Sequence, residues 1–318
     1  MNDQAPLDAT LHAFKKRDKR FVLIGAAVAY YLAVLSVGAV FIALTWGLWG
    51  EAMRWYFGVL GAISSGVEPA APPQHLMIGL LPYYLATIPI GLLLFAAFEA
   101  ACLRWLVRGE SGGGLFGLRL DSDTWRVFGV YWLWIAYFLC VVIAIALFYA
   151  VLVAIGGIGG AARLIAMLAG ALAPLGILAL LVWGGVLFAP AAAASVGRRK
   201  LTFLSARKIS APRFWPLLTS FVLVMVGYLI ASTVLSTILQ IPVNQAMAPV
   251  VQSVVRGGDG AQALALLQEA LLTPPMVGVI VVNVLASLML ATVYYIAMFG
   301  VNARAFDAAL EAGDASRG

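Results

Sequence analysis

The chain has 318 residues, of which 63% are hydrophobic and 11% are charged, and its formal net charge is +6. Water-soluble domains contain about 45–50% apolar and about 25% charged residues, so this composition excludes a soluble enzyme. It also excludes a disordered chain, because disorder requires low hydrophobicity. The composition therefore predicts an integral membrane protein.

Six apolar segments are long enough to cross a membrane, which takes roughly 20 residues for about 30 Å of hydrocarbon. They are residues 21–47, 76–103, 127–153, 162–190, 214–241 and 276–303. Transmembrane β-strands would instead be segments of about 10 residues with alternating polarity, and the sequence has no such alternation. We therefore predict an all-α fold with six transmembrane helices, the first of them retained rather than cleaved as a signal peptide.

Lysine and arginine are distributed unequally between the segments that connect these spans. If the N-terminus is inside, only Arg54, Arg163 and Arg256 of the 20 basic residues lie outside. Because positive charge is retained on the cytoplasmic side, both termini are predicted to be cytoplasmic. The expected organisation is a basic N-terminal segment over 1–20, a membrane domain over 21–304 and a cytoplasmic tail over 305–318.

Segments beside the outer ends of the spans have the periodicity of amphipathic helices. Residues 243–256 carry an apolar stripe, residues 257–260 interrupt it with glycines and an aspartate, and residues 261–272 resume it. A similar stripe occurs over residues 51–60. One apolar stripe on an otherwise polar helix is typical of a helix lying on a membrane surface. We therefore predict amphipathic surface helices here, two of them forming a hairpin that either lies on the outer membrane surface or caps the helix bundle.

Glu99, near the inner end of the second span, is the one acidic residue within the six apolar segments. An ionisable side chain at membrane depth is a candidate for a functional site. Arg104 follows five residues later and Arg108 nine residues later. We expect Glu99 to form a structural ion pair with one of these arginines, and the alternative is a role in proton or substrate binding.

Uncharged polar residues define one face on each of the last two spans. Ser232 and Ser236 share a face of the fifth span, and Asn283 and Ser287 share a face of the sixth. Residues four apart lie on the same side of a helix. Such faces form hydrogen bonds between helices more often than they line a pore. These four residues, with Glu99 and Arg104, are the candidate intramembrane polar site.

Basic residues between the fourth and fifth spans are expected to contact anionic lipid headgroups. The candidate contacts are Arg198, Arg199, Lys200, Arg207 and Lys208. Nucleic acid is not expected as a partner, because no basic run is long or accompanied by a soluble domain.

The sequence contains no combination of residues typical of catalysis. His12 and His75, the two histidines, lie outside the spans, and neither a Ser–His–Asp set nor a metal-ligand cluster can be assembled. Asp121 and Asp123 are two residues apart in a loop, which is more typical of a turn or a helix cap than of a metal site. We therefore predict no catalytic, cofactor-binding or metal site.

Residues 193–218 have the sequence AASVGRRKLTFLSARKISAPRFWPLL. This basic stretch, with a Phe-Trp pair opening the next span, resembles the inner loop of multi-span bacterial inner-membrane proteins. Those proteins are similar to the membrane domain that precedes some glycerophosphoryl diester phosphodiesterases. The resemblance covers residues 160–304 and implies a place in a bacterial inner membrane. The catalytic barrel of those enzymes, with its acidic metal site, is absent from this sequence, so their activity is not expected.

Two functional hypotheses follow from these features. The leading hypothesis is a non-catalytic inner-membrane protein that binds lipids or a partner protein, either another membrane protein or a second copy of itself. The alternative is a transporter of small solutes or lipids. Prolines within the second and fourth spans favour it, since broken helices occur at transport sites. They are Pro82, Pro89 and Pro174.

Overall fold

The computed structural model describes residues 6–16, 21–64, 66–111, 113–114, 117–255 and 260–313. Every regular element in these ranges is helical, as predicted. Six helices are long and apolar enough to span a membrane. They are α3 (Val22–Ser64), α4 (Gln74–Leu103), α5 (Ser122–Gly156), α6 (Gly160–Phe188), α9 (Phe214–Val255) and α11 (Pro274–Glu311).

Shorter helices precede, connect or extend these six. They are α1 (Pro6–Thr10), α2 (His12–Lys15), the π-helical turn η1 (Arg104–Arg108), α7 (Ala191–Gly197), α8 (Ala206–Ser210), the 3-10 turn η2 (Ala211–Arg213) and α10 (Gly260–Leu272).

The chain divides into two compact units. Unit 1 comprises residues 1–26, 95–224 and 296–318. Unit 2 comprises residues 27–94 and 225–295. Four of the long helices (α3, α4, α9 and α11) contribute residues to both units, whereas α5 and α6 belong to unit 1 alone.

Two of the predicted surface helices are not separate elements. Residues 51–60 continue α3, and residues 243–255 continue α9. The helix passes through Pro242 and Pro249 without ending. In apolar surroundings a helix is the conformation that keeps backbone hydrogen bonds satisfied, so proline is tolerated there. The third surface helix, α10, is present where it was expected, and the turn predicted before it lies mostly outside the described residues.

These helical extensions pack together within unit 2. Phe57 from α3, Val250 from α9 and Ala263 from α10 are buried against one another. Partly buried apolar side chains surround them, namely Leu60, Met247, Leu264, Leu266 and Leu267. The apolar stripes seen in the sequence therefore cover one another rather than each contacting a membrane surface separately.

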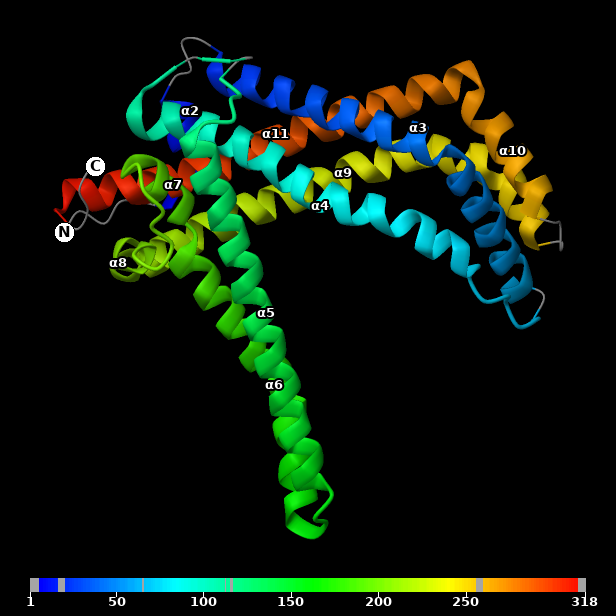
Figure 1. Ribbon diagram of the computed structural model, residues 1–318, viewed down its shortest axis with the longest axis horizontal. Helices are drawn as coiled ribbons and strands as arrows, with labels where there is room; N and C mark the ends of the chain where they lie inside the picture. The colour runs from blue at the N-terminus through cyan, green and yellow to red at the C-terminus, as the bar shows by residue number, and fades with distance from the viewer. Residues whose placement is uncertain are drawn as a thin grey trace. The chain divides into compact units, whose positions relative to one another are not determined.

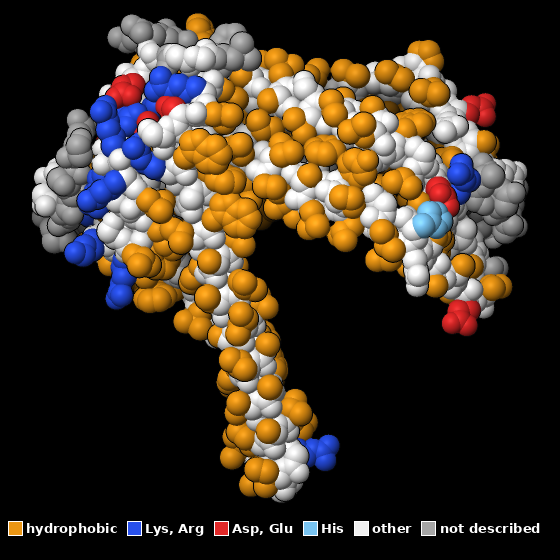
Figure 2. All heavy atoms as spheres, in the orientation of Figure 1, with side chains coloured by type: hydrophobic (Ala, Val, Ile, Leu, Met, Phe, Trp, Pro, Cys, Tyr) orange, Lys and Arg blue, Asp and Glu red, His pale blue; other side chains and the backbone are white. Residues whose placement is uncertain are grey.

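In unit 1, α5 and α6 lie side by side as an antiparallel hairpin (Figure 1). Both are covered by hydrophobic side chains (Figure 2). In the most apolar 18-residue stretch of α5 no residue is buried. Outward-facing apolar side chains are expected of helices whose solvent is lipid, because lipid tails are as apolar as leucine.

The other end of unit 1 has a dense core rich in alanine. Phe98 and Leu103 from α4, Val196 from α7, Ile209 from α8 and Phe306 from α11 are fully buried there. Helix α11 continues through residue 305, where the cytoplasmic tail is predicted to begin, as far as Glu311. The buried ring of Phe306 accounts for this, since it anchors the last turns of α11 in the core.

Candidate functional site

A cluster of charged side chains lies where α4 ends and α5 begins, and we call it the charged cluster. It consists of Arg104, Arg108, Arg119, Asp121, Asp123 and Arg126, all in unit 1. The turn η1 carries the first two arginines and ends at Gly109, whose φ of 68° is accessible to glycine without strain. Such π-helical turns are rare and often occur at functional sites.

Arg104 is almost completely buried, and its partners come from the loop before α5. Its Nη1 donates to Asp121 Oδ2 at 2.5 Å, and its Nη2 donates to the carbonyl oxygen of Gly117 at 2.8 Å. Glu99 is also buried, and it accepts a hydrogen bond from the hydroxyl of Tyr131. The predicted ion pair between Glu99 and an arginine is therefore wrong. The loop folds back over η1 and supplies Arg104 with a carboxylate that the sequence places 17 residues away.

Asp121 caps the N-terminus of α5. Its Oδ1 accepts from the backbone N–H groups of Asp123 at 3.1 Å and Thr124 at 3.0 Å. Burial raises the pKa of Asp121, but the Thr124 N–H and the charges of Arg104 and Arg119 outweigh burial, so the pKa lies below its ordinary value. The interpretation of Asp121 as a helix cap is confirmed.

Asp123 joins η1 to α5. It accepts from Arg108 Nη2 at 2.5 Å and from Arg126 Nη1 at 2.6 Å. Arg108 also donates to the carbonyl oxygen of Val196 in α7 at 3.0 Å. These contacts hold the guanidinium groups of Arg108 and Arg126 against one buried carboxylate within the protein.

The candidate lipid contacts lie on α8 and the loop between α7 and α8. Arg198 donates to Ser205 at 3.3 Å, and Arg199 pairs with Glu110 at 3.2 Å. Lys200, Arg207 and Lys208 are exposed and have no acidic partner among the described residues. We call these last three residues the basic surface. Lysine and arginine side chains gather at this end of unit 1 (Figure 2).

Large apolar side chains are exposed in the same part of the sequence. The exposed fraction is 78% for Leu204 and 72% for Trp215. Exposed aromatic and aliphatic groups beside basic residues are typical of a membrane–water interface, where the ring lies at headgroup level.

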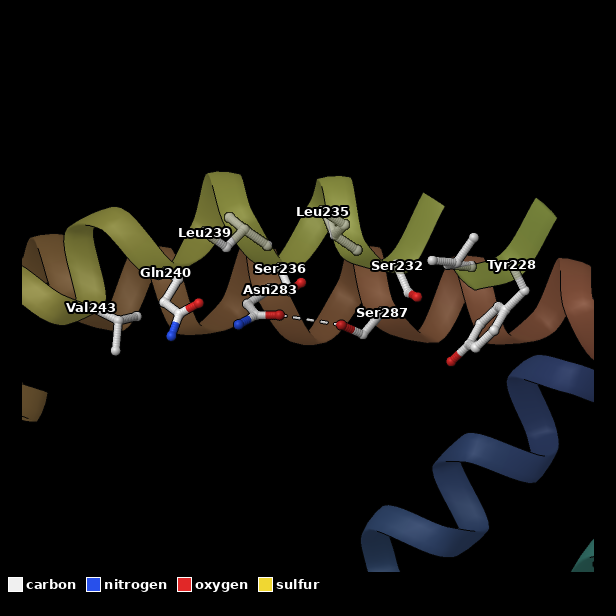
Figure 3. Close-up of a pocket in the computed structure, with 10 residues that line it drawn as sticks. Tyr228, Ser232, Leu235, Ser236, Leu239, Gln240, Val243, Asn283 and Ser287 are labelled. Atoms are coloured by element: carbon white, nitrogen blue, oxygen red, sulfur yellow. Dashed lines mark hydrogen bonds between the residues drawn. The ribbon is translucent and has the colours of Figure 1, made fainter. Parts of the chain in front are cut away.

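A second site lies in unit 2, in a groove of about 450 Å³ between α9 and α11. The four predicted residues Ser232, Ser236, Asn283 and Ser287 all line it. The remaining lining residues are Tyr228, Leu235, Leu239, Gln240, Val243 and Leu290. We call this the polar groove, and Figure 3 shows its polar side chains projecting to the same side of α9.

Hydrogen bonds within the polar groove leave several polar groups available. Ser287 donates to Asn283 Oδ1 at 3.2 Å, as the dashed line in Figure 3 marks. Ser232 and Ser236 donate to backbone carbonyl oxygens three residues earlier, both at 3.0 Å. The lone pairs of both hydroxyl oxygens, the amide of Gln240 and the Nδ2 of Asn283 have no hydrogen-bond partner among the described residues.

Tyr228 was not among the predicted site residues. Its spacing could have identified it, because Tyr228, Ser232, Ser236 and Gln240 recur every four residues along α9. Its ring centroid lies 4.6 Å from that of Tyr294 in α11. The contact between Tyr228 and Tyr294 could not be predicted from spacing, since it depends on how α9 and α11 are aligned.

No protein-family model, curated protein or solved structure matches the chain. Within the part of the chain that the structure describes, no three His, Cys, Asp or Glu side chains lie close enough to hold a metal ion. The basic surface offers ionic attraction, and the polar groove offers neutral hydrogen bonding.

Proposed function

We propose that the protein is a non-catalytic, multi-pass protein of a bacterial inner membrane that binds anionic lipid headgroups through its basic surface. The observation that carries this proposal is a contrast between two groups of cations. Arg104, Arg108 and Arg126 are paired with carboxylates, whereas Lys200, Arg207 and Lys208 are exposed without an acidic partner among the described residues. An anion outside the protein can therefore bind the second group without displacing a carboxylate of the protein.

The neighbouring apolar side chains support a lipid as the source of this anion. Leu204 lies between Lys200 and Arg207 in the sequence, and Trp215 follows soon after Lys208. Both are exposed and suit the apolar side of a membrane interface. A soluble anion would gain nothing from them. With both termini cytoplasmic, the basic surface would face the inner leaflet, where anionic lipids attract basic segments by about 1 kcal/mol per residue.

The proposal can be tested in nanodiscs that contain phosphatidylcholine with a small fraction of phosphatidylglycerol. Bound lipids are counted by native mass spectrometry for the wild type and for Lys200→Gln/Arg207→Gln/Lys208→Gln. Each basic residue near a membrane surface contributes about 1 kcal/mol to the attraction of anionic lipids. Loss of three charges should therefore reduce the preference for phosphatidylglycerol about 100-fold. Arg163→Gln, which removes a cation near the start of α6, is the matched control and should retain the preference.

An equal preference in the wild type and the triple variant would show that the basic surface does not select lipids. Recovery of a single protein partner, lost in the triple variant, would instead assign the basic surface to a protein contact.

The second candidate function is transport of a small solute or lipid, and the polar groove favours it. Counterflow in liposomes can separate the candidates by comparing the wild type with Asn283→Ala and Glu99→Gln. Because Asn283 lines the groove and Glu99 pairs with Tyr131, a transporter should lose flux in the first variant and keep it in the second. Absence of flux for every solute tested would leave lipid binding as the function.

A further inference from the structure

Tyrosine side chains lie beside the polar groove in unit 2. The hydroxyl groups of Tyr31 in α3 and Thr292 in α11 are 3.4 Å apart. The ring of Tyr294 in α11 packs on that of Tyr228 in α9. The rings of Tyr30 and Tyr31 are 5.1 Å apart, and Tyr294 neighbours Tyr295 at 5.4 Å. We call these five residues the tyrosine cluster. Tyr228 belongs to both the cluster and the polar groove, so the two are continuous.

The combined surface occupies a long stretch of an apolar helix. Asn283 lies nine residues and Tyr294 twenty residues after Pro274, the first residue of α11. At a rise of 1.5 Å per residue, these positions are about 13 Å and about 30 Å along the helix axis, so the surface extends over roughly half of a hydrocarbon layer.

The available polar groups require an occupant. The amide of Asn283 and the hydroxyl lone pairs of Ser232 and Ser236 lie within the predicted spans 276–303 and 214–241 and would otherwise contact acyl chains. An unsatisfied polar group in hydrocarbon costs several kcal/mol. The occupant must therefore offer both hydrogen-bond acceptors, for the amide donors, and donors, for the serine oxygens.

The occupant must also be uncharged. The lining contains no Asp, Glu, Lys, Arg or His. The sequence has no Asp, Glu, Lys or Arg from Phe214 to Gln252 or from Leu271 to Ala303. A charged group in the groove would lose its hydration without gaining a counter-charge, which is unfavourable in a medium of low dielectric constant. Hydroxyl groups satisfy both requirements, because each donates and accepts and none is charged.

We propose that the polar groove and the tyrosine cluster bind an uncharged, hydroxyl-rich group, either the glycerol headgroup of a neutral lipid or a free polyol. The leucines of the lining, Leu235, Leu239 and Leu290, provide apolar contact beside the hydrogen-bonding groups. Aromatic rings suit such ligands, since a tyrosine presents an apolar face with a hydroxyl at its edge. This inference deepens the second candidate function and does not depend on the basic surface.

The test uses the full chain in phosphatidylcholine nanodiscs with a diacylglycerol that carries a photoreactive group on one acyl chain. Labelled peptides from α9 and α11 are quantified by mass spectrometry. Labelling should fall about fivefold to tenfold in Gln240→Leu/Asn283→Leu, which removes two sets of intramembrane hydrogen bonds. Tyr228→Phe, a milder change that removes one hydroxyl, should reduce it about twofold to threefold. Thr237→Val is the matched control, because Thr237 lies on α9 outside the lining, and its labelling should equal that of the wild type.

Two further arms identify the source and the charge of the ligand. Excess glycerol that abolishes the labelling would identify a free polyol, and labelling that resists glycerol would identify the lipid headgroup. Phosphatidic acid with the same photoreactive chain should label less than diacylglycerol.

Three results would overturn the inference. The first is equal labelling of the wild type and both groove variants, and the second is phosphatidic acid labelling the protein as strongly as diacylglycerol does. The third is the formation of disulfide-linked dimers by Ser236→Cys that persist on dilution. Such dimers would place a second copy of the chain in the groove. Because the readout is binding, a positive result with no counterflow would refute transport and retain the site.

Discussion

At the scale of single residues, close packing at the core of unit 1 determines which side chains are tolerated. Gly197 ends α7 beside the ring of Phe306, which is fully buried. A Cβ atom at position 197 would overlap this ring. A buried ring held by its neighbours cannot move aside without disturbing the core, because protein interiors are close-packed.

We expect Gly197→Ala to lower the free energy of unfolding by about 1–3 kcal/mol, the usual effect of overpacking a core. Thermal unfolding in detergent micelles provides the measurement. Gly227→Ala in α9 is the control, since nothing lies within 4 Å of a Cβ atom there. The control should be as stable as the wild type or slightly more so, because alanine favours a helix. Equal destabilisation of both variants would contradict this account of Gly197.

The second prediction at this scale concerns pH and His12. Burial lowers the pKa of His12 to about 4, and the charges of Lys16 and Arg304 act in the same direction against the carboxylates of Asp8 and Glu311. Asp307 Oδ2 lies 3.7 Å from Nε2 of His12. Because the pKa is lower in the folded state, the unfolded state binds the proton more readily between its ordinary value of 6.5 and about 4. The stability that His12 contributes is therefore complete above pH 6.5 and falls as the pH drops towards 4.

Hydrogen exchange of the α2 amides at pH 7.5 and pH 5, corrected for intrinsic rates, should reveal weaker protection at the lower pH. His12→Gln should remove this difference because its side chain does not titrate. His75→Gln, which changes the other histidine, should retain it. Protection that is independent of pH in the wild type would refute the prediction.

At the scale of elements, the connection between α4 and α5 depends on buried charges. Asp123, in the first turn of α5, receives hydrogen bonds from Arg108 of η1 and Arg126 of α5. Removing one member of a buried ion pair leaves the other charge desolvated, which costs about 3–5 kcal/mol. The π-helical turn therefore depends on the carboxylate that faces it.

Asp123→Asn should accordingly lower the free energy of unfolding by about 3 kcal/mol or more. Chemical denaturation of the purified protein provides the measurement. Glu110→Gln is a demanding control because Glu110 also pairs with Arg108, at 2.8 Å. Glu110 is exposed, so its loss should cost about 0–1 kcal/mol. If both variants lose the same stability, burial of Asp123 is not the cause.

At the scale of the whole molecule, hydropathy predicts the number of crossings and the distribution of Lys and Arg predicts their direction. A reporter that folds only outside the cytoplasm, such as alkaline phosphatase, should be active when fused after Gly66 or Gly157, which lie between helices at the side with few basic residues. Green fluorescent protein, which folds in the cytoplasm, should fluoresce when fused after Gly313. The physical reason is the retention of Lys and Arg on the cytoplasmic side. An active phosphatase at Gly313 would reverse the predicted orientation.

Much of the fold could be predicted because it depends on local properties of the chain. A charge-free apolar run such as 127–153 is unstable in water and stable among acyl chains, whatever surrounds it. The ends of the helices were harder to predict. The apolar stripe of 51–60 indicated a separate surface helix, but α3 continues through these residues without a break.

The sequence by itself determined the six apolar helices, the separation of basic from apolar segments and the polar face of each helix, because each depends on residues that are neighbours along the chain. Only the tertiary structure decided which faces meet. It placed Ser232 and Asn283 in one groove and gave Arg104 to Asp121 rather than to Glu99. The physical reason is that hydropathy and periodicity specify what a surface needs to contact, whereas the identity of its partner depends on packing between residues far apart in the chain.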